Sequence, residues 1–197
     1  MYLPVRLMLA AAAGAVVLIV WGMLFWGFLA PPLGVFHALP NASQVTAALE
    51  SGGAPTGTYF MPWPRRTKEE FRRFVAQHKS GPFYRVSWVR EGVDPSSPGK
   101  ILAGCGLDLA VSVLAVALLA AAGPGSSGRR FRIVLLAGLL GSAFITVGDP
   151  VWFHMPWDYV RGVLVYEVVS WFLLAATLAW LAKPRRDRAF VRSGISR

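Results

Sequence analysis

The sequence predicts an all-α membrane protein with four transmembrane helices and a small extracytoplasmic α+β cap between the first and second helices. Three observations lead to this prediction. Of the 197 residues, 55% are hydrophobic and only 15% are charged, which is too apolar for an ordinary soluble domain. Four apolar runs are long enough to cross a bilayer. The Lys and Arg residues near these runs are unevenly distributed, as in membrane proteins with a fixed orientation.

The first predicted transmembrane helix lies within residues 1–30. Residues 7–30 carry no charge, and a helix of this length, roughly 36 Å, crosses a hydrocarbon core of about 30 Å. The run exceeds the apolar core of a secretory signal peptide, which is about 7–15 residues long, so we expect a retained anchor. Trp21 and Trp26 fit the aromatic belt of a membrane interface, and the proline pair that follows ends the helix.

Two capping patterns predict helices in residues 31–98, the segment that forms the cap. Asn41 with Gln44 three residues later predicts the start of one helix. Thr67 with Glu70 matches the capping box, in which a threonine and a glutamate at this spacing satisfy each other's backbone N–H groups. The cap therefore contains two short helices.

Two strands are expected between and after these helices. Residues 58–61 are rich in strand-forming residues, and Tyr84, Val86 and Trp88 alternate with polar residues within residues 83–89. A cap of about 65 residues is marginal for independent folding, so we expect it to pack on the helix ends.

The other three predicted transmembrane helices lie within residues 99–182. They cover residues 101–122, 131–148 and 159–182. A tight turn at 123–130 separates the first two, and an aromatic and acidic loop at 149–158 separates the last two. The run at 131–148, about 18 residues, is just long enough to cross.

The orientation follows from the positive-inside rule. Arg6, the arginines near residue 130 and the basic tail, residues 183–197, would share one side of the membrane, where Asp187 is the opposing acidic residue. The loop at 149–158 has two aspartates and no Lys or Arg. We therefore expect a bacterial inner-membrane protein with both termini in the cytoplasm. The tail could also bind anionic lipid, although setting the orientation is the simpler interpretation.

Two acidic residues, Asp108 and Glu167, lie inside predicted transmembrane helices, where an ionisable group costs about 2.5–3.5 kcal/mol. Both are expected roughly 11–12 Å below the outer surface. They could share a proton or bind a cation, with Arg161 as counter-ion and with Ser170 and Trp171 on the same helix face as Glu167. The alternative is that both carboxylates hydrogen-bond to neighbouring helices and hold the bundle together.

The loop before the last helix supplies a second set of candidates. The candidates at the outer surface are Trp152, His154, Trp157 and Asp158. The first three, with the cap, could roof the pocket. The alternative is that the aromatic residues only anchor the chain at the interface.

Metal and cofactor sites are not expected. Cys105 is the only cysteine, which excludes a disulfide or a zinc site made of thiolates. The histidines, His37, His78 and His154, lie outside the predicted helices, whereas a membrane haem needs imidazoles within them. Metal binding by His37 and His154 with a loop aspartate is the less favoured alternative. No nucleic-acid motif and no catalytic motif such as HExxH is present.

Several short motifs together resemble a family of uncharacterised bacterial four-span membrane proteins. They are Leu-Pro-Asn at 39–41, Gly-Thr-Tyr-Phe-Met-Pro at 57–62, Gly-Pro at 81–82, Ser-Pro at 97–98, residues 152–156, and Glu167 with Trp171. The resemblance covers nearly the whole chain. The family has an amide at the position of Asp108 and an aspartate at that of Glu167, which argues against an obligatory pair of carboxylates. It has no assigned activity, so the resemblance implies the architecture and no mechanism.

These observations favour a non-catalytic function. We expect an accessory or scaffolding protein that contacts the lipid bilayer and other subunits of a larger bacterial membrane complex, with no nucleic acid as partner. The alternative is a small binding or transport module that uses Asp108, Glu167 and Arg161 in an outward-facing pocket for a proton, a cation or a lipid-like ligand. An enzyme is the third choice.

Overall fold

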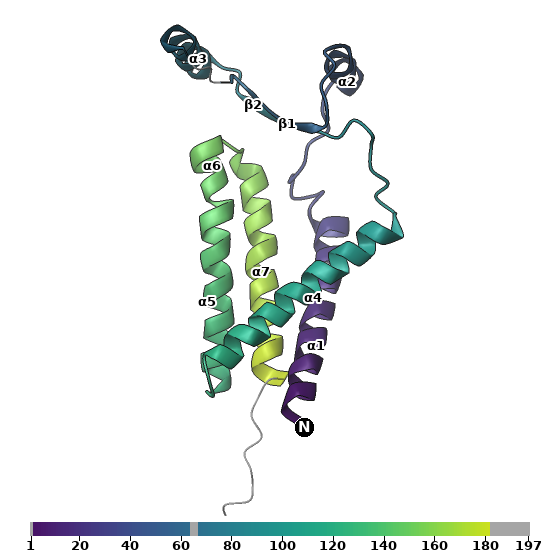
Figure 1. Cartoon of the computed structure of the whole chain (residues 1–197), viewed down its shortest axis with the longest axis vertical. Coiled ribbons are helices and arrows are strands. Elements are labelled where there is room, and N and C mark those ends of the chain that lie inside the picture. Colours follow the sequence, from purple (N-terminus) through teal and green to yellow (C-terminus); the bar gives the residue numbers. More distant parts are fainter. Residues whose placement is uncertain (1, 64–66, 182–197) are drawn as a thin grey trace, which may run out of the picture. The chain divides into compact units, whose positions relative to one another are not determined.

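The computed structural model describes residues 2–63 and 67–181, and the basic tail at 183–197 lies outside the described residues. The chain divides into two units. The first comprises Met1–His37 and Pro98–Arg197, and the second comprises Ala38–Ser97. The second unit is thus inserted between the first and second long helices of the first unit (Figure 1).

Among the described residues, four helices are long and apolar enough to cross a membrane, which indicates a multi-pass membrane protein. They are α1 (Tyr2–Leu24), continued by the π-helical turn η1 (Phe25–Leu29); α4 (Pro98–Ala121); α5 (Ser127–Thr146), followed by the short α6 (Gly148–Phe153); and α7 (Trp157–Leu181). The uninterrupted apolar runs in the sequence explain these lengths, since nothing within them terminates a helix.

The four long helices form a bundle in which α1 packs against both α4 and α7, and α5 packs against α7. The helix α4 crosses the other helices obliquely and comes nearest to α5 beside the turn that joins them (Figure 1). The other end of α4 lies apart from α5.

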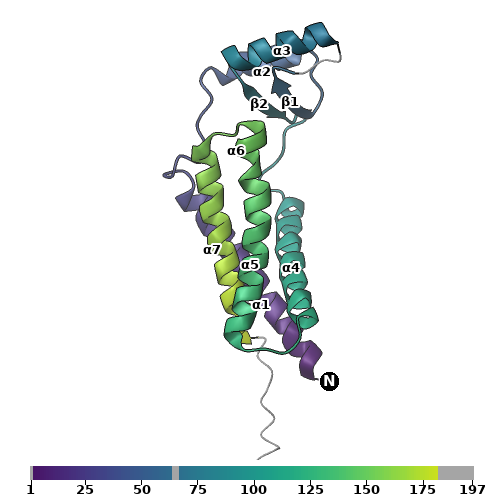
Figure 2. The same ribbon diagram turned by 90° about the vertical axis from the view of Figure 1, so that its left-hand side faces the viewer.

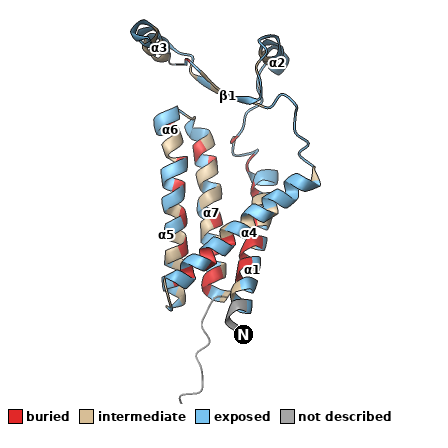
Figure 3. Cartoon of the chain, viewed as in Figure 1, coloured by how far each residue is buried: buried red, intermediate tan, exposed pale blue. Residues whose placement is uncertain are grey.

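The core of the bundle lies where α7 and α4 pack on α1, with Val134 added from α5, and buried positions mark the facing sides of these helices (Figure 3). Val134, Leu174 and Leu178 are almost completely buried there. Outward-facing apolar side chains stay exposed, as for Phe144, which is 85% exposed. Such exposure is what a lipid environment requires, because lipid tails solvate apolar side chains as well as a protein core does.

Two glycines allow close approach of helices in this bundle. A Cβ atom at Gly14 would lie 2.2 Å from Oγ of Ser112 on α4, and a Cβ at Gly138 would lie 2.0 Å from Cδ2 of Trp171 on α7. Any larger residue would force these helices apart. Small residues are used in this way at many membrane helix contacts.

The second unit consists of two helices and two strands. They are α2 (Ala42–Ser51), β1 (Gly57–Met61), α3 (Lys68–Ser80) and β2 (Tyr84–Trp88). The strands pair antiparallel, with Gly57 opposite Trp88 and Met61 opposite Tyr84. Both helices lie on the same side of the strand pair (Figures 1 and 2).

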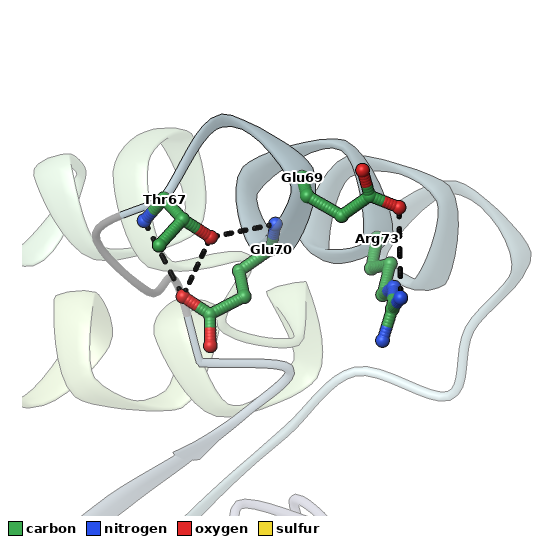
Figure 4. A network of polar contacts seen from close by, with 4 residues as sticks. All are labelled: Thr67, Glu69, Glu70 and Arg73. Atoms are coloured by element: carbon green, nitrogen blue, oxygen red, sulfur yellow. Dashed lines mark hydrogen bonds and ion pairs between the residues drawn. The ribbon is translucent and has the colours of Figure 1, made fainter.

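The predicted capping box at the start of α3 is confirmed (Figure 4). Oγ1 of Thr67 accepts a hydrogen bond from the Glu70 backbone N–H at 3.2 Å, and the Glu70 carboxylate accepts one from the Thr67 N–H at 3.3 Å. Glu69 and Arg73, one turn further on, form an ion pair at 3.5 Å. Both of these side chains are more than 70% exposed, so this pair contributes little stability.

The second unit has almost no buried core. Pro62 is the only buried residue in the part of this unit that the structure describes, and neither α2 nor α3 has one. Polar contacts hold the strand ends instead. The indole N–H of Trp88 donates to the Ala54 carbonyl at 3.1 Å, and the Thr56 hydroxyl donates to the Glu91 carboxylate at 2.6 Å.

The helix start predicted at Asn41 is confirmed, since α2 begins at Ala42. The side chain of Asn41 makes no capping bond, and its backbone adopts a left-handed conformation with φ of 52°. The loop predicted at 149–158 is wrong. The segment 149–158 is mostly helical, since α6 covers its first half and α7 begins at Trp157. The left-handed His154, with φ of 51°, ends α6.

The helix α5 begins earlier than the predicted residue 131. Oγ of Ser126 accepts a hydrogen bond from the Arg129 N–H at 3.2 Å and so caps the helix at Ser127. The guanidinium of Arg129 donates to the carbonyl oxygens of Ala122 and Pro124 at 2.9 Å. The arginines near residue 130 therefore lie on the first turns of the helix.

Candidate functional site

Two polar contacts join α5 to α7. Oγ1 of Thr146 lies 2.8 and 2.9 Å from the two carboxylate oxygens of Glu167, to which it donates. One helical turn away, Nε1 of Trp171 donates to Oγ of Ser142 at 3.2 Å. The helices run antiparallel, so residues spaced four apart on one helix meet residues spaced four apart on the other. Glu167 thus does hydrogen-bond to a neighbouring helix, which was the structural alternative.

Glu167 also borders a cavity of about 290 Å³ inside the bundle. All four long helices contribute to its lining, with Leu18 from α1 and Val111 from α4 among the apolar residues. The polar part of its wall also includes Asp108 on α4, Ser142 on α5, and Tyr166, Ser170 and Trp171 on α7. The structure therefore brings together four of the five residues of the predicted pocket.

The two carboxylates have different surroundings. Glu167 is held by Thr146, whereas Asp108 has no hydrogen bond or ion pair with any residue in the described part of the chain. None of the cavity-lining residues that the structure describes is a Lys, Arg or His. The cavity therefore carries two acidic groups and no compensating cation among the lining residues that the structure describes.

Arg161, the predicted counter-ion, lies elsewhere. Its guanidinium donates to the carboxylate of Asp158, three residues earlier on α7. Both side chains are well exposed, at 70% and 62%, and neither lines the cavity. The nearer carboxylate on the same helix face attracts the arginine, as expected for an i, i+3 pair.

The predicted roof of the pocket is not part of its wall. Trp152 is 77% exposed on α6, Trp157 is 55% exposed at the start of α7, and neither they nor His154 line the cavity. An interfacial anchoring role for these aromatic residues stays a prediction.

An aromatic cluster next to the cavity was not predicted. Rings of Trp21, Phe25 and Trp26, at the end of α1 and in η1, surround Tyr166 of α7. The carbonyl oxygen of Tyr166 accepts two hydrogen bonds, from the Trp21 indole at 3.1 Å and from the Ser170 hydroxyl at 2.7 Å. This cluster ties α1 to α7 beside the cavity and so supports the orientation of Ser170.

The α5 side of the site was also missed. Ser142 and Thr146 are buried, and together with Gly138 they form a stripe at four-residue spacing that faces α7. A row of small and hydroxyl residues at this spacing is a signal of close helix contact, and it could have identified this face of α5 from the sequence.

Among the residues that the structure describes, no three His, Cys, Asp or Glu side chains come together as a metal-binding group. Neither a family model, nor a curated protein, nor a solved structure matches this chain. The resemblance to an uncharacterised bacterial family therefore stays a prediction, and the chemistry of the cavity is the basis on which its function can be argued.

Proposed function

We propose that this protein binds a small amphipathic molecule within the membrane, in the cavity between its four long helices. The observation that carries this proposal is the position of Asp108, whose carboxylate has no partner among the described residues and lines the same cavity as Glu167. An ionisable group inside a transmembrane helix marks a functional site by default, because its cost must be offset by an interaction.

A purely structural role accounts for Glu167 but not for Asp108. The hydrogen bonds between Thr146 and Glu167 join α5 to α7. Asp108 makes no such bond to another described helix. Its carboxylate therefore makes no polar contact with the described helices that would stabilise the bundle. A bound ligand would supply the missing partner.

The size and lining of the cavity support a ligand with an apolar part. A volume of about 290 Å³ is near the lower end of ligand sites, which hold roughly 300–1,000 Å³. Leu18, Val111, Ile145 and Leu174 make much of its wall apolar. A bare ion would leave this surface empty, whereas an amphipathic molecule would cover it.

The orientation in the membrane is part of the proposal. The arginines on the first turns of α5 and the predicted basic tail favour a cytoplasmic location for both termini. A bacterial inner membrane is the setting that this charge distribution and the short-motif resemblance support best.

An accessory function in a larger membrane complex is the second candidate. Large apolar side chains of the second unit are exposed, including Trp63 at 64% and Phe71 at 54%, in a unit that buries almost nothing itself. Partner subunits would cover such side chains. Purification in mild detergent followed by mass spectrometry tests this candidate, and a stoichiometric partner would favour it.

Filling the cavity tests the ligand-binding proposal. A Cβ atom at Gly141, which lines the cavity, would meet no atom within 4 Å, so Gly141→Leu adds a side chain without a backbone clash. The neutral amphiphile dodecanol serves as probe, with occupancy measured by native mass spectrometry of the full chain. We expect Gly141→Leu to lower occupancy at least tenfold.

The matched control is Gly104→Leu on α4. Its added Cβ would also meet nothing within 4 Å, and the position does not line the cavity, so occupancy should match that of the unaltered protein. Equal occupancy in all three proteins would contradict the proposal.

A further inference from the structure

A second cavity of about 210 Å³ lies beside the first. Leu114 and Leu118 of α4 and Val134 and Ala137 of α5 line it. Its only side chain with a polar atom is that of Trp171, whose indole N–H is already bonded to Ser142. This second cavity is therefore entirely apolar in character.

The two cavities share two residues, Val111 and Trp171. On α4, Asp108 lines the first cavity, Val111 lines both, and Leu114 and Leu118 line the second. These positions follow one face of the helix and extend over about 15 Å. The cavities thus adjoin at Val111 and Trp171. Together they are called the groove below, with its acidic end among α1, α4, α5 and α7 and its apolar end between α4 and α5 beside Trp171.

The charge of the groove selects the kind of ligand. Two carboxylates lie at its polar end, and no described lining residue is basic. A cationic head group would neutralise Asp108, whereas an anionic one would be repelled. The rings of Tyr166 and Trp171 border the same end, and aromatic faces attract ammonium groups.

We infer that the ligand is a single-chain amphiphile with a cationic head group, held by Asp108 at the polar end and with its chain along Leu114 and Leu118. This inference rests on the proposed function and names its ligand class. Glu167 is already occupied by Thr146, so Asp108 is the principal partner of the head group and Glu167 is secondary.

The test compares three probes of equal chain length, the cationic dodecyltrimethylammonium, the neutral dodecanol and the anionic dodecyl sulfate. Each is added to the full chain in neutral-lipid nanodiscs, and binding is measured by native mass spectrometry. We expect the cationic probe to bind at least tenfold more tightly than the neutral one, with the anionic probe weakest. Asp108→Asn should abolish the preference for the cation.

Two matched controls accompany these variants. Asp158→Asn removes the same charge outside the cavity and should keep the preference for the cation.

Ala137→Trp fills the apolar end of the groove and should weaken binding of the cationic and the neutral probe alike, at least tenfold. Leu136→Trp, at a neighbouring position that is 64% exposed and lines neither cavity, should weaken neither.

The outcomes separate this inference from the proposed function. If Gly141→Leu blocks dodecanol but the unaltered protein shows no preference for the cation, the inference is wrong and the proposed function stands. If Gly141→Leu affects no probe, both are wrong. The preference of the unaltered protein for the cationic over the neutral probe tests the inference even if Asp108→Asn does not fold.

The source of the ligand can be identified in the same experiments. A cationic lipid that co-purifies with the protein and is lost in Asp108→Asn would identify the bilayer as the source. Tight binding of added dodecyltrimethylammonium to protein that carries no lipid would identify a free amphiphile. An anionic lipid that occupies the groove and is displaced by Ala137→Trp would overturn the inference.

Discussion

The indole of Trp171 occupies a position that depends on the absence of a side chain on the facing helix. Gly138 leaves the space, Ser142 accepts the indole N–H, and the ring then borders both cavities. One glycine therefore determines both the distance between α5 and α7 and the shape of the groove.

Gly138→Ala should destabilise the bundle. The new Cβ would lie 2.0 Å from Cδ2 of Trp171, and overpacking of this kind costs about 1–3 kcal/mol. The measurement is the temperature at which half of the detergent-solubilised protein is lost from the folded peak in size-exclusion chromatography. Gly141→Ala, on the same helix with no atom within 4 Å of its Cβ, is the control and should leave that temperature unchanged. Equal losses for both variants would contradict the packing argument.

Glu91 provides a residue-scale prediction about pH. The hydrogen bond from Thr56 lowers the pKa of this exposed carboxyl below its ordinary value of 4.5. Because the folded pKa lies below the unfolded one, the interaction stabilises the fold above pH 4.5 and is lost as pH falls through the lowered pKa. A titration of the Glu91 carboxyl carbon by NMR should give a midpoint below 4.5.

The matched pair for this titration is Thr56→Val and Thr58→Val. The first removes the donor and should raise the pKa of Glu91 towards its ordinary value, whereas the second makes the same change on β1 and should not move it. A midpoint that is the same in all three proteins would show that the hydrogen bond is not formed in solution.

At the scale of single elements, α3 depends on its capping box more than on packing, because it has no buried residue. Thr67→Ala should cost the helix about 0.5–2 kcal/mol, the usual effect of losing such a cap. Hydrogen exchange of the amides in the first turn of α3 should become faster in this variant. Thr67→Ser keeps the hydroxyl and should retain the protection. Unchanged exchange in Thr67→Ala would mean that the cap is unimportant here.

Elements were predictable from the sequence where their causes are local. The capping box needs only Thr67 and Glu70, three residues apart, and the long helices need only continuous apolar runs. The short helix α6 was missed because the aromatic and acidic residues of 149–158 were interpreted as a loop. Pro150 is nevertheless tolerated there, since the first turn of a helix does not need its N–H.

The candidate site was predictable only in part, for a different physical reason. An acidic residue within a long apolar run is easily recognised, so Asp108 and Glu167 could be selected from the sequence alone. The spacing of Gly138, Ser142 and Thr146 could have identified a contact face on α5. It does not say which helix meets that face or in which register. The pairing of Thr146 with Glu167 and of Ser142 with Trp171 therefore emerged only from the structure, as did the apolar end of the groove. The predicted counter-ion Arg161 pairs with Asp158 instead.

For the whole molecule, the central prediction concerns topology. If all four helices cross the membrane, both termini share one side, and we predict from the charge distribution that this side is the cytoplasm. A fluorescent protein fused after Arg197 should fluoresce, and alkaline phosphatase fused there should be inactive. The same two reporters inserted after Gly92, in the second unit, should behave in the opposite way. Identical behaviour at both positions would exclude an odd number of crossings between them.

The oblique course of α4 (Figure 1) links the groove to the thickness of the surrounding bilayer. This helix has 24 residues, about 36 Å, and it fits a hydrocarbon layer of about 30 Å by tilting. Thicker bilayers favour a more upright helix. We expect such a change in α4, which comes nearest to α5 beside the turn that joins them, to bring Asp108 closer to α5. Lipid chain length would thus act as a regulator, with long-chain bilayers narrowing the acidic end of the groove and short-chain bilayers widening it.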